Sequence, residues 1–115
     1  MTIFKICSAV EWAAAEAAGA YRGSAVHHQD GFIHFSTAEQ AEETASRHFA
    51  GQGGLVLVAV DPAALGPALK WEFSSSRGED FPHLYAPLTC DAMKWARPLK
   101  RGENDTFVLP DLDKK

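Results

Sequence analysis

The segment Leu55–Val60 constrains the fold most, because aliphatic residues follow one another there without a polar break. A run of this length, rich in β-branched side chains, predicts a buried central strand. The glycine-rich residues 51–54 precede the run, and Asp61 and Pro62 end it. A short turn of helix is expected to follow as far as Leu65. We therefore expect the chain to fold around this strand.

A capping signal places one helix directly after an opening strand. Ser8 is followed three residues later by Glu11, which is the spacing of a capping box. The alanine-rich run 12–18 has a high helix propensity. Gly19 is expected to end this helix in the left-handed conformation.

A second capping signal places another helix in the same half of the chain. Ser36 or Thr37 is expected to cap it, with Glu39 or Gln40 at the reciprocal position. We expect this helix to run to about Ala50, before the glycine-rich segment.

Short strands account for most of the remaining chain. They are expected at residues 2–7, 31–35, 68–73, 81–88, 92–99 and 106–109. Residues 20–30 and 74–80 are expected to form loops, and residues 110–115 a frayed tail. Because helices come early and strands late, we expect an α+β fold with a curved, split and mainly antiparallel sheet. At 115 residues, the chain is expected to form a single domain over residues 1–115.

Composition and charge narrow the possible partners. The formal net charge of −4 argues against a nucleic-acid-binding surface. The basic stretch 94–101 is interpreted as the solvated face of a strand, with a lining for an anionic ligand as the minority interpretation. No apolar run is long enough to span a bilayer, so we expect no membrane association.

The cysteines and the histidines outside the strands indicate neither a disulfide framework nor a metal site. Cys7 and Cys90 lack the spacing of a disulfide framework or a zinc motif, and we expect both to be small core residues of a reduced, cytoplasmic protein. His27 and His28 are adjacent in a loop, but no third ligand has convincing spacing. We therefore expect no metal.

Two short segments, 30–37 and 81–88, carry most of the functional information. Each contains one histidine in a strand-like run, so that its imidazole leaves the sheet on one defined face. Half-buried histidines on neighbouring strands, with hydroxyl groups beside them, would form a compact polar site. We predict that His34 and His83 line the same concave surface.

His34 has two interpretations. Because its neighbours Ile33 and Phe35 are apolar, it could be a core histidine that makes one hydrogen bond. Ser36 and Thr37 follow at a strand-to-helix junction, where unpaired amides and the positive end of the helix dipole favour an anion. We therefore expect a phosphate or carboxylate to bind at this junction.

His83 also has two interpretations. Tyr85 is two residues away, so both side chains point the same way in a strand and could orient a ligand together. Alternatively, Phe81 and Tyr85 belong to the core and His83 lies at an edge. Glu72 could act as a base or bind a ribose hydroxyl, although such a residue more often faces solvent.

The sequence resembles the small bacterial and plant proteins grouped as domain of unknown function 952. The resemblance runs almost from end to end, and its most specific parts are residues 11–12, 19–21, 31–40 and 81–88. The opening strand of that family often carries His where this chain has Lys5.

The resemblance implies a fold similar to the ADP-ribosyltransferase superfamily, whose members include the tRNA 2′-phosphotransferases and use NAD. It implies an NAD-sized cleft, with NAD as the cofactor. The implied catalytic residues are His34 and His83, and the implied cofactor-binding residues are Ser36, Thr37, Tyr85, Lys5 and Tyr21. No glutamate occurs in the sequence context of the catalytic glutamate of classical ADP-ribosyltransferases.

Three hypotheses for the function remain open at this point. The first is an enzyme that transfers an ADP-ribosyl or phosphoryl-ribose group, with His34 and His83 orienting the nucleotide. The second is a module that binds a nucleotide or metabolite without chemistry, and the third is a protein-interaction domain with structural histidines. We favour a nucleotide-type cleft with a small-molecule ligand, and nucleic acid only as a modified RNA end.

Overall fold

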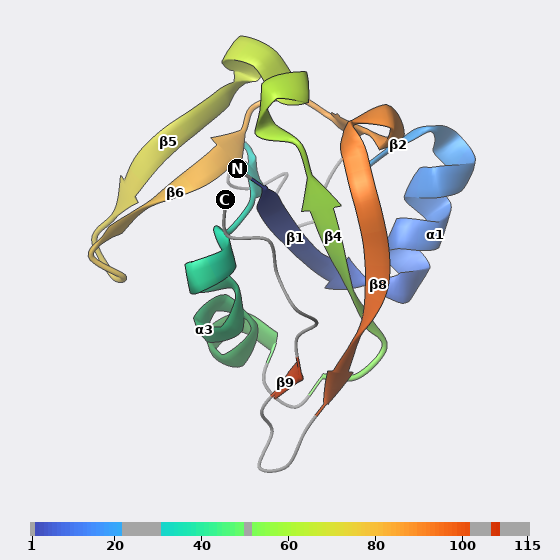
Figure 1. Cartoon of the computed structure of the whole chain (residues 1–115), viewed down its shortest axis with the longest axis horizontal. Helices are drawn as coiled ribbons and strands as arrows, with labels where there is room; N and C mark the ends of the chain where they lie inside the picture. Colours follow the sequence, from blue (N-terminus) through green and yellow to red (C-terminus); the bar gives the residue numbers. More distant parts are fainter. Residues whose placement is uncertain (1, 22–30, 50–51, 102–106, 109–115) are drawn as a thin grey trace.

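The expected buried strand is present as β4 (Leu55–Val60), inside an antiparallel sheet with strand order β1-β4-β8-β9. The computed structural model describes residues 2–21, 31–49, 52–101 and 107–108. The neighbours of β4 are β1 (Ile3–Ser8) and β8 (Met93–Arg101), and β9 (Phe107–Val108) pairs with the end of β8. Figure 1 shows β1, β4 and β8 side by side through the middle of the molecule.

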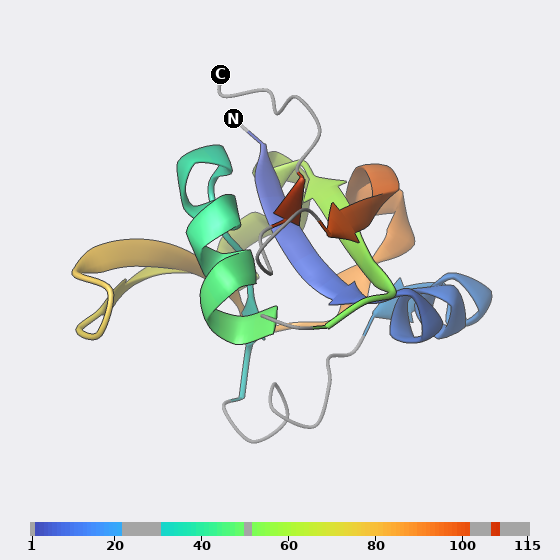
Figure 2. The same ribbon diagram turned by 90° about the horizontal axis from the view of Figure 1, so that it is seen from below.

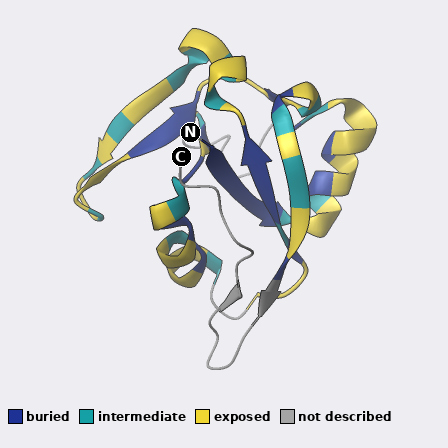
Figure 3. Cartoon of the chain, viewed as in Figure 1, coloured by how far each residue is buried: buried dark blue, intermediate teal, exposed yellow. Residues whose placement is uncertain are grey.

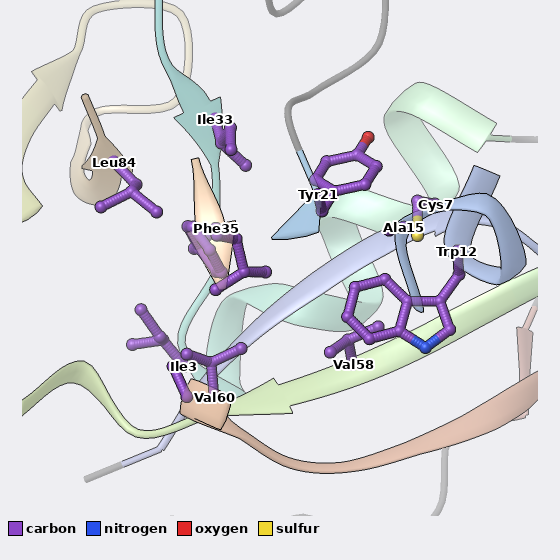
Figure 4. Close-up of a cluster of buried hydrophobic side chains, with 12 residues drawn as sticks. Ile3, Cys7, Trp12, Ala15, Tyr21, Ile33, Phe35, Val58, Val60 and Leu84 are labelled. Atoms are coloured by element: carbon purple, nitrogen blue, oxygen red, sulfur yellow. The ribbon is translucent and has the colours of Figure 1, made fainter. Parts of the chain in front are cut away.

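Side chains of β1 alternate between two hydrophobic clusters, one on each face of this sheet. Ile3 and Cys7 belong to the first cluster, which is drawn in Figure 4. Phe4 and Ile6 belong to the second. Because successive side chains of a strand point to opposite faces, Lys5 lies on the face of the first cluster. A charged residue is thus placed in the middle of β1, a strand that Figure 3 shows as buried along most of its length.

Two helices pack on this sheet, one with each cluster. Helix α1 (Ala9–Ala18) contributes Trp12 and Ala15 to the first cluster. Helix α3 (Ala38–Phe49) contributes Ala45 to the second. Figure 2 shows the two helices on opposite sides of β1.

Both capping predictions are confirmed. The Glu11 amide donates to the Ser8 hydroxyl at 3.0 Å, and Gly19 ends α1 with φ 87°. At α3, the cap is Thr37 with Gln40 as its reciprocal partner. The Thr37 amide donates to Gln40 Oε1 at 3.0 Å, and the Gln40 amide donates to Thr37 Oγ1 at 3.3 Å.

A second antiparallel sheet stands beside the first. Its strand order is β3-β6-β5, with β3 at Ile33–His34, β6 at Glu79–Leu84 and β5 at Leu69–Ser74. The two sheets meet where the Phe4 and Ser36 backbones exchange hydrogen bonds of 2.8 Å. Hairpin β5–β6 projects away from β1 beside α3 (Figures 1 and 2).

The remaining elements are short. Strand β2 (Ala20–Tyr21) pairs with β7 (Leu88–Thr89), and the 3-10 helices are η1 (Pro62–Ala68) and η2 (Cys90–Ala92). The described residues therefore form an α+β fold with antiparallel sheets, as predicted.

Some predicted element boundaries were wrong. Residues 74–80 are not a continuous loop, because only 75–78 form the hairpin turn and β6 already begins at Glu79. Gly78 closes that turn at φ 71°, a conformation that most side chains disfavour. The strand predicted at 81–88 ends at Leu84, so Tyr85 lies outside it.

Two other predicted segments are only partly as expected. The strand predicted at 31–35 is limited to Ile33–His34, followed by the bridge between Ser36 and Phe4. The loop predicted at 20–30 begins with strand β2, and residues 22–30 lie outside the described part of the chain. The predicted frayed tail and the end of the second helix at Ala50 also lie outside it.

Candidate functional site

His34 and His83 are direct cross-strand partners. The register of β3 and β6 places one opposite the other, and their ring centroids are 4.8 Å apart at an interplanar angle of 84°. Both residues line one cavity, so the prediction that they share a concave surface is confirmed. His34 is exposed, whereas His83 is only 7% exposed.

The Phe32 ring joins the two histidines into an aromatic cluster. It stacks on His83 with centroids 4.0 Å apart and an interplanar angle of 21°. It also meets His34 edge-on at 4.7 Å and Tyr85 at 5.3 Å. Phe32 is two residues before His34, so the strand period could have identified it as a neighbour on the same face.

Glu72 of β5 connects His83 to Tyr85. The Tyr85 hydroxyl donates to Glu72 Oε1 at 2.5 Å, and His83 Nδ1 lies 2.8 Å from the same oxygen. Hydrogen bonds from Tyr85 and then from His83 lower the pKa of Glu72, so this carboxyl stays ionised. An ionised carboxylate only accepts hydrogen bonds, which places a proton on His83 Nδ1 and, in the neutral ring, a lone pair on Nε2.

The cavity has a volume of about 670 Å³ and lies at the junction of the two sheets and α3. Cationic or titratable basic side chains gather in its lining, namely Lys5, His34, His48, Arg77 and His83, with Glu11 as the acidic member. The pKa of His48 is lowered by burial and then by the charges of Arg77, Arg47 and Lys5. Among the described lining residues, basic side chains therefore outnumber acidic ones.

Lys5 is the most unusual member of the lining, because a lysine is rarely buried. It is 4% exposed, and its Nζ lies 5.9 Å from the centre of the Tyr21 ring. Burial lowers its pKa from 10.5 to about 8, against the opposing charges of Cys7 and Glu11. Burial also raises the pKa of Cys7 to about 11 and raises that of Tyr21. Burial thus favours the neutral forms of these three side chains, while a lysine with a pKa of about 8 is still mostly protonated at pH 7.

Arg77 connects the turn of hairpin β5–β6 to α3. Its Nε and Nη2 each lie 2.8 Å from Glu43 Oε2, and its Nη1 donates to Thr44 Oγ1 at 3.2 Å. The guanidinium also lies 4.4 Å from the centre of the Phe81 ring. Ser36 joins this network by donating to Thr44 Oγ1 at 2.9 Å. No sequence signal marks Arg77, because its role depends on the hairpin folding against α3.

Two of the amides expected to be free at the Ser36–Thr37 junction are occupied, so the expectation was wrong for these two. The Ser36 amide donates to the Phe4 carbonyl at 2.8 Å, and the Thr37 amide is occupied by Gln40. The Ser36 side chain does line the cavity. An anion at this site would therefore be bound by cationic side chains rather than by these amides.

The other predicted residues divide between the cavity and its surroundings. Lys5 and Tyr21 are part of the lining with both histidines, whereas Thr37 and Tyr85 are not among the described lining residues. Tyr85 reaches the cluster only through Glu72 and Phe32 and is 42% exposed.

The predictions about a metal ion and a membrane can be compared only with the described residues. Within residues 2–21, 31–49, 52–101 and 107–108, no three His, Cys, Asp or Glu side chains gather in a way that could hold a metal ion. His27 and His28 lie outside those ranges. None of the described helices is both long and apolar enough to cross a membrane.

Comparison with known proteins identifies a family and similar solved structures, and the descriptions of both name no activity. A family described as "Protein of unknown function (DUF952)" matches residues 6–96. The chain is similar to the crystal structure of protein CC0527 from Caulobacter crescentus, with 46% identity, a TM-score of 0.89 and 94% of each chain covered. It is also similar to the solution NMR structure of CC0527, with 48% identity, a TM-score of 0.81 and coverage of 91% of this chain and 90% of that one. No curated protein matches the chain.

Proposed function

We propose that this chain, which belongs to the DUF952 family, binds an anionic nucleotide of the NAD or ADP-ribose type in the cavity beside His34 and His83. One observation carries this proposal. The paired histidines and their stacked Phe32 line the same cavity as Lys5, so an aromatic surface and a cation face one space.

The size and chemistry of the cavity support a nucleotide. Its volume of about 670 Å³ falls within the usual range of about 300–1,000 Å³ for ligand pockets. The Phe32 ring offers a surface on which a base or nicotinamide could stack. Lys5 and Arg77 would attract phosphate groups, and the hydroxyls of Ser36 and Tyr21 could bind ribose oxygens.

The pair formed by Glu72 and His83 supports a transfer reaction in the same cavity. Glu72 holds the proton of His83 on Nδ1, which leaves Nε2 able to accept a proton from an attacking hydroxyl. His34, beside it, would orient the ribose or phosphate. The proposed activity is therefore ADP-ribosyl or phosphoryl-ribose transfer by a protein related in fold to the ADP-ribosyltransferases, with NAD as the cofactor.

A thermal-shift screen tests the binding part. The purified protein is melted with NAD, ADP-ribose and a 2′-phosphorylated RNA end, each at increasing concentration. A ligand present at about 100 times its dissociation constant stabilises the folded protein by roughly 2.7 kcal/mol. We expect NAD or ADP-ribose to raise the melting temperature in a saturable way.

A matched pair of variants controls for general charge effects. Lys5→Gln removes a cation from the cavity, whereas Arg97→Gln removes one from β8, where Arg97 stacks on Trp95 outside the cavity lining. The ligand-induced shift should fall in Lys5→Gln and persist in Arg97→Gln. The proposal fails if neither nucleotide shifts the wild type, or if both variants respond like the wild type.

A further inference from the structure

We infer that Lys5 is a covalent attachment point, whose amine forms an imine with the open-chain aldehyde of a phosphorylated sugar held in the cavity. This inference rests on the proposed function, because ring-opened ADP-ribose is the nucleotide ligand that carries such an aldehyde. NAD has no free aldehyde, since nicotinamide occupies that carbon. Of the two proposed ligands, ADP-ribose is therefore the one that would react with Lys5.

The position of Lys5 is the first support. It lies in the middle of β1, is 4% exposed, and lines the same cavity as His34 and His83. Imine-forming lysines are typically desolvated in this way, because burial favours the neutral amine over the ammonium. Lys5 can therefore contact a ligand in the cavity, although little of its surface is exposed to bulk water.

The neighbours of Lys5 can support the chemistry. The Lys5 lone pair attacks the aldehyde carbon and forms a C–N bond, while the carbonyl oxygen takes a proton and the nitrogen loses one. The resulting hydroxyl then takes a second proton and leaves as water, and the nitrogen gives up its remaining proton as C=N forms. Glu11 lines the same cavity, and its carboxyl is the group proposed to exchange these protons.

The other nucleophile near this point is Cys7, and it is less suited to the reaction. Its pKa is raised to about 11 by burial, so the reactive thiolate is scarce at neutral pH. With a pKa of about 8, roughly a tenth of Lys5 is already the neutral amine at pH 7. The structure thus favours reaction at nitrogen rather than at sulfur.

Reductive trapping tests the inference on the wild-type protein. The protein is incubated with ADP-ribose and sodium cyanoborohydride, which converts an imine into a stable amine, and the adduct is located by peptide mass spectrometry. Because Lys5 lines the cavity that would hold the sugar, we expect it to be labelled at least about tenfold faster than Lys70 and Lys94, which are exposed and lie outside the described lining. NAD under the same conditions should give no adduct. Adducts on Lys70 and Lys94 with Lys5 unmodified would overturn the inference.

Two controls separate this inference from the proposed function. Lys5→Arg keeps the positive charge and Lys5→Met keeps the side-chain length, and both should lose the adduct at this position. Calorimetry without reductant measures binding separately. If ADP-ribose binds while Lys5 stays unlabelled, the inference fails and the proposed function stands. If ribose 5-phosphate labels Lys5 while neither nucleotide binds, the nucleotide function fails and the attachment point stands.

Discussion

His34 on β3 and His83 on β6 face one another across two paired strands, yet their surroundings differ sharply. The His34 side chain is exposed, whereas His83 is 7% exposed and held by Glu72 at 2.8 Å. One member of this pair is therefore exposed, and the other is buried and hydrogen-bonded.

Replacing each histidine with alanine should separate these two environments. His34→Ala removes an exposed ring, so we expect a loss of less than about 1.5 kcal/mol in the free energy of unfolding. His83→Ala leaves a cavity beside the stacked Phe32 ring and removes the hydrogen bond to Glu72, so we expect a loss of about 2–4 kcal/mol. Urea denaturation of both variants measures the difference. Equal losses, or a larger loss for His34→Ala, would contradict the assigned environments.

Lys5→Met should stabilise the protein at pH 7, because it removes a buried ammonium from β1. The folded-state pKa of about 8 lies below the ordinary 10.5, so folding disfavours the protonated lysine. We expect a gain of about 1–3 kcal/mol, measured by urea denaturation.

The pH dependence of that gain follows from the sign of the shift in the Lys5 pKa. Between about 8 and 10.5 the unfolded chain binds more protons at this lysine than the folded protein does. This group therefore makes the wild type more stable as pH rises through that window, and the advantage of Lys5→Met should shrink. A constant difference between the two proteins from pH 7 to pH 10 would show that the Lys5 pKa is not lowered.

Glu72→Gln should change the titration of Tyr85. The hydrogen bond to the charged Glu72 raises the pKa of Tyr85 above its ordinary 10.0, because ionising the phenol would place two negative charges together. Without that charge, the pKa of Tyr85 should fall towards 10.0 in a spectrophotometric titration. The chain has two tyrosines, and Tyr85→Phe identifies the signal of Tyr21. An unchanged titration in Glu72→Gln would contradict the observed hydrogen bond.

Arg77→Gln should loosen hairpin β5–β6 from α3. The variant loses the ion pair with Glu43 and the contact with Phe81, at an expected cost of about 1–2 kcal/mol. Hydrogen exchange should become faster in β5 and β6 and stay unchanged in β1 and β4. Arg47→Gln is the matched control, because Arg47 is half exposed and lies 3.8 Å from the same Glu43 oxygen. It should cost less than about 0.5 kcal/mol, and similar exchange in both variants would contradict the role of Arg77.

The parts of the fold that depend on local signals were predictable from the sequence. The uninterrupted aliphatic run predicts β4. The spacing of Ser8 and Glu11 predicts the start of α1, and that of Thr37 and Gln40 predicts the start of α3. Such signals act within one turn or one strand, so neighbouring residues are sufficient to detect them. Short pairings such as β2 with β7 depend on contacts between distant segments and were missed.

In the candidate site too, residues marked by a local sequence pattern were predictable, and residues whose role depends on distant contacts were not. The histidines were identified because a histidine in a strand-like run is unusual, whereas Arg77 lies in a polar turn that resembles an ordinary loop. Glu72 was considered, but its hydrogen bonds to His83 and Tyr85 require the register of β5 and β6, which one sequence does not reveal. The Ser36 amide is occupied through the strand bridge to Phe4, which is a tertiary contact, whereas the Thr37 amide is occupied by its local cap partner Gln40.

Calorimetric titration of ADP-ribose tests the central claim, which is that the cavity beside His34 and His83 binds an anionic nucleotide. The titration is made into the wild type, into His34→Ala and into Arg97→Gln. We predict saturable binding with one site in the wild type, a loss of at least about tenfold in affinity in His34→Ala, and no change in Arg97→Gln, since tenfold corresponds to about 1.4 kcal/mol of lost contact. The absence of heat in the wild type, or equal affinity for wild type and His34→Ala, would contradict the account.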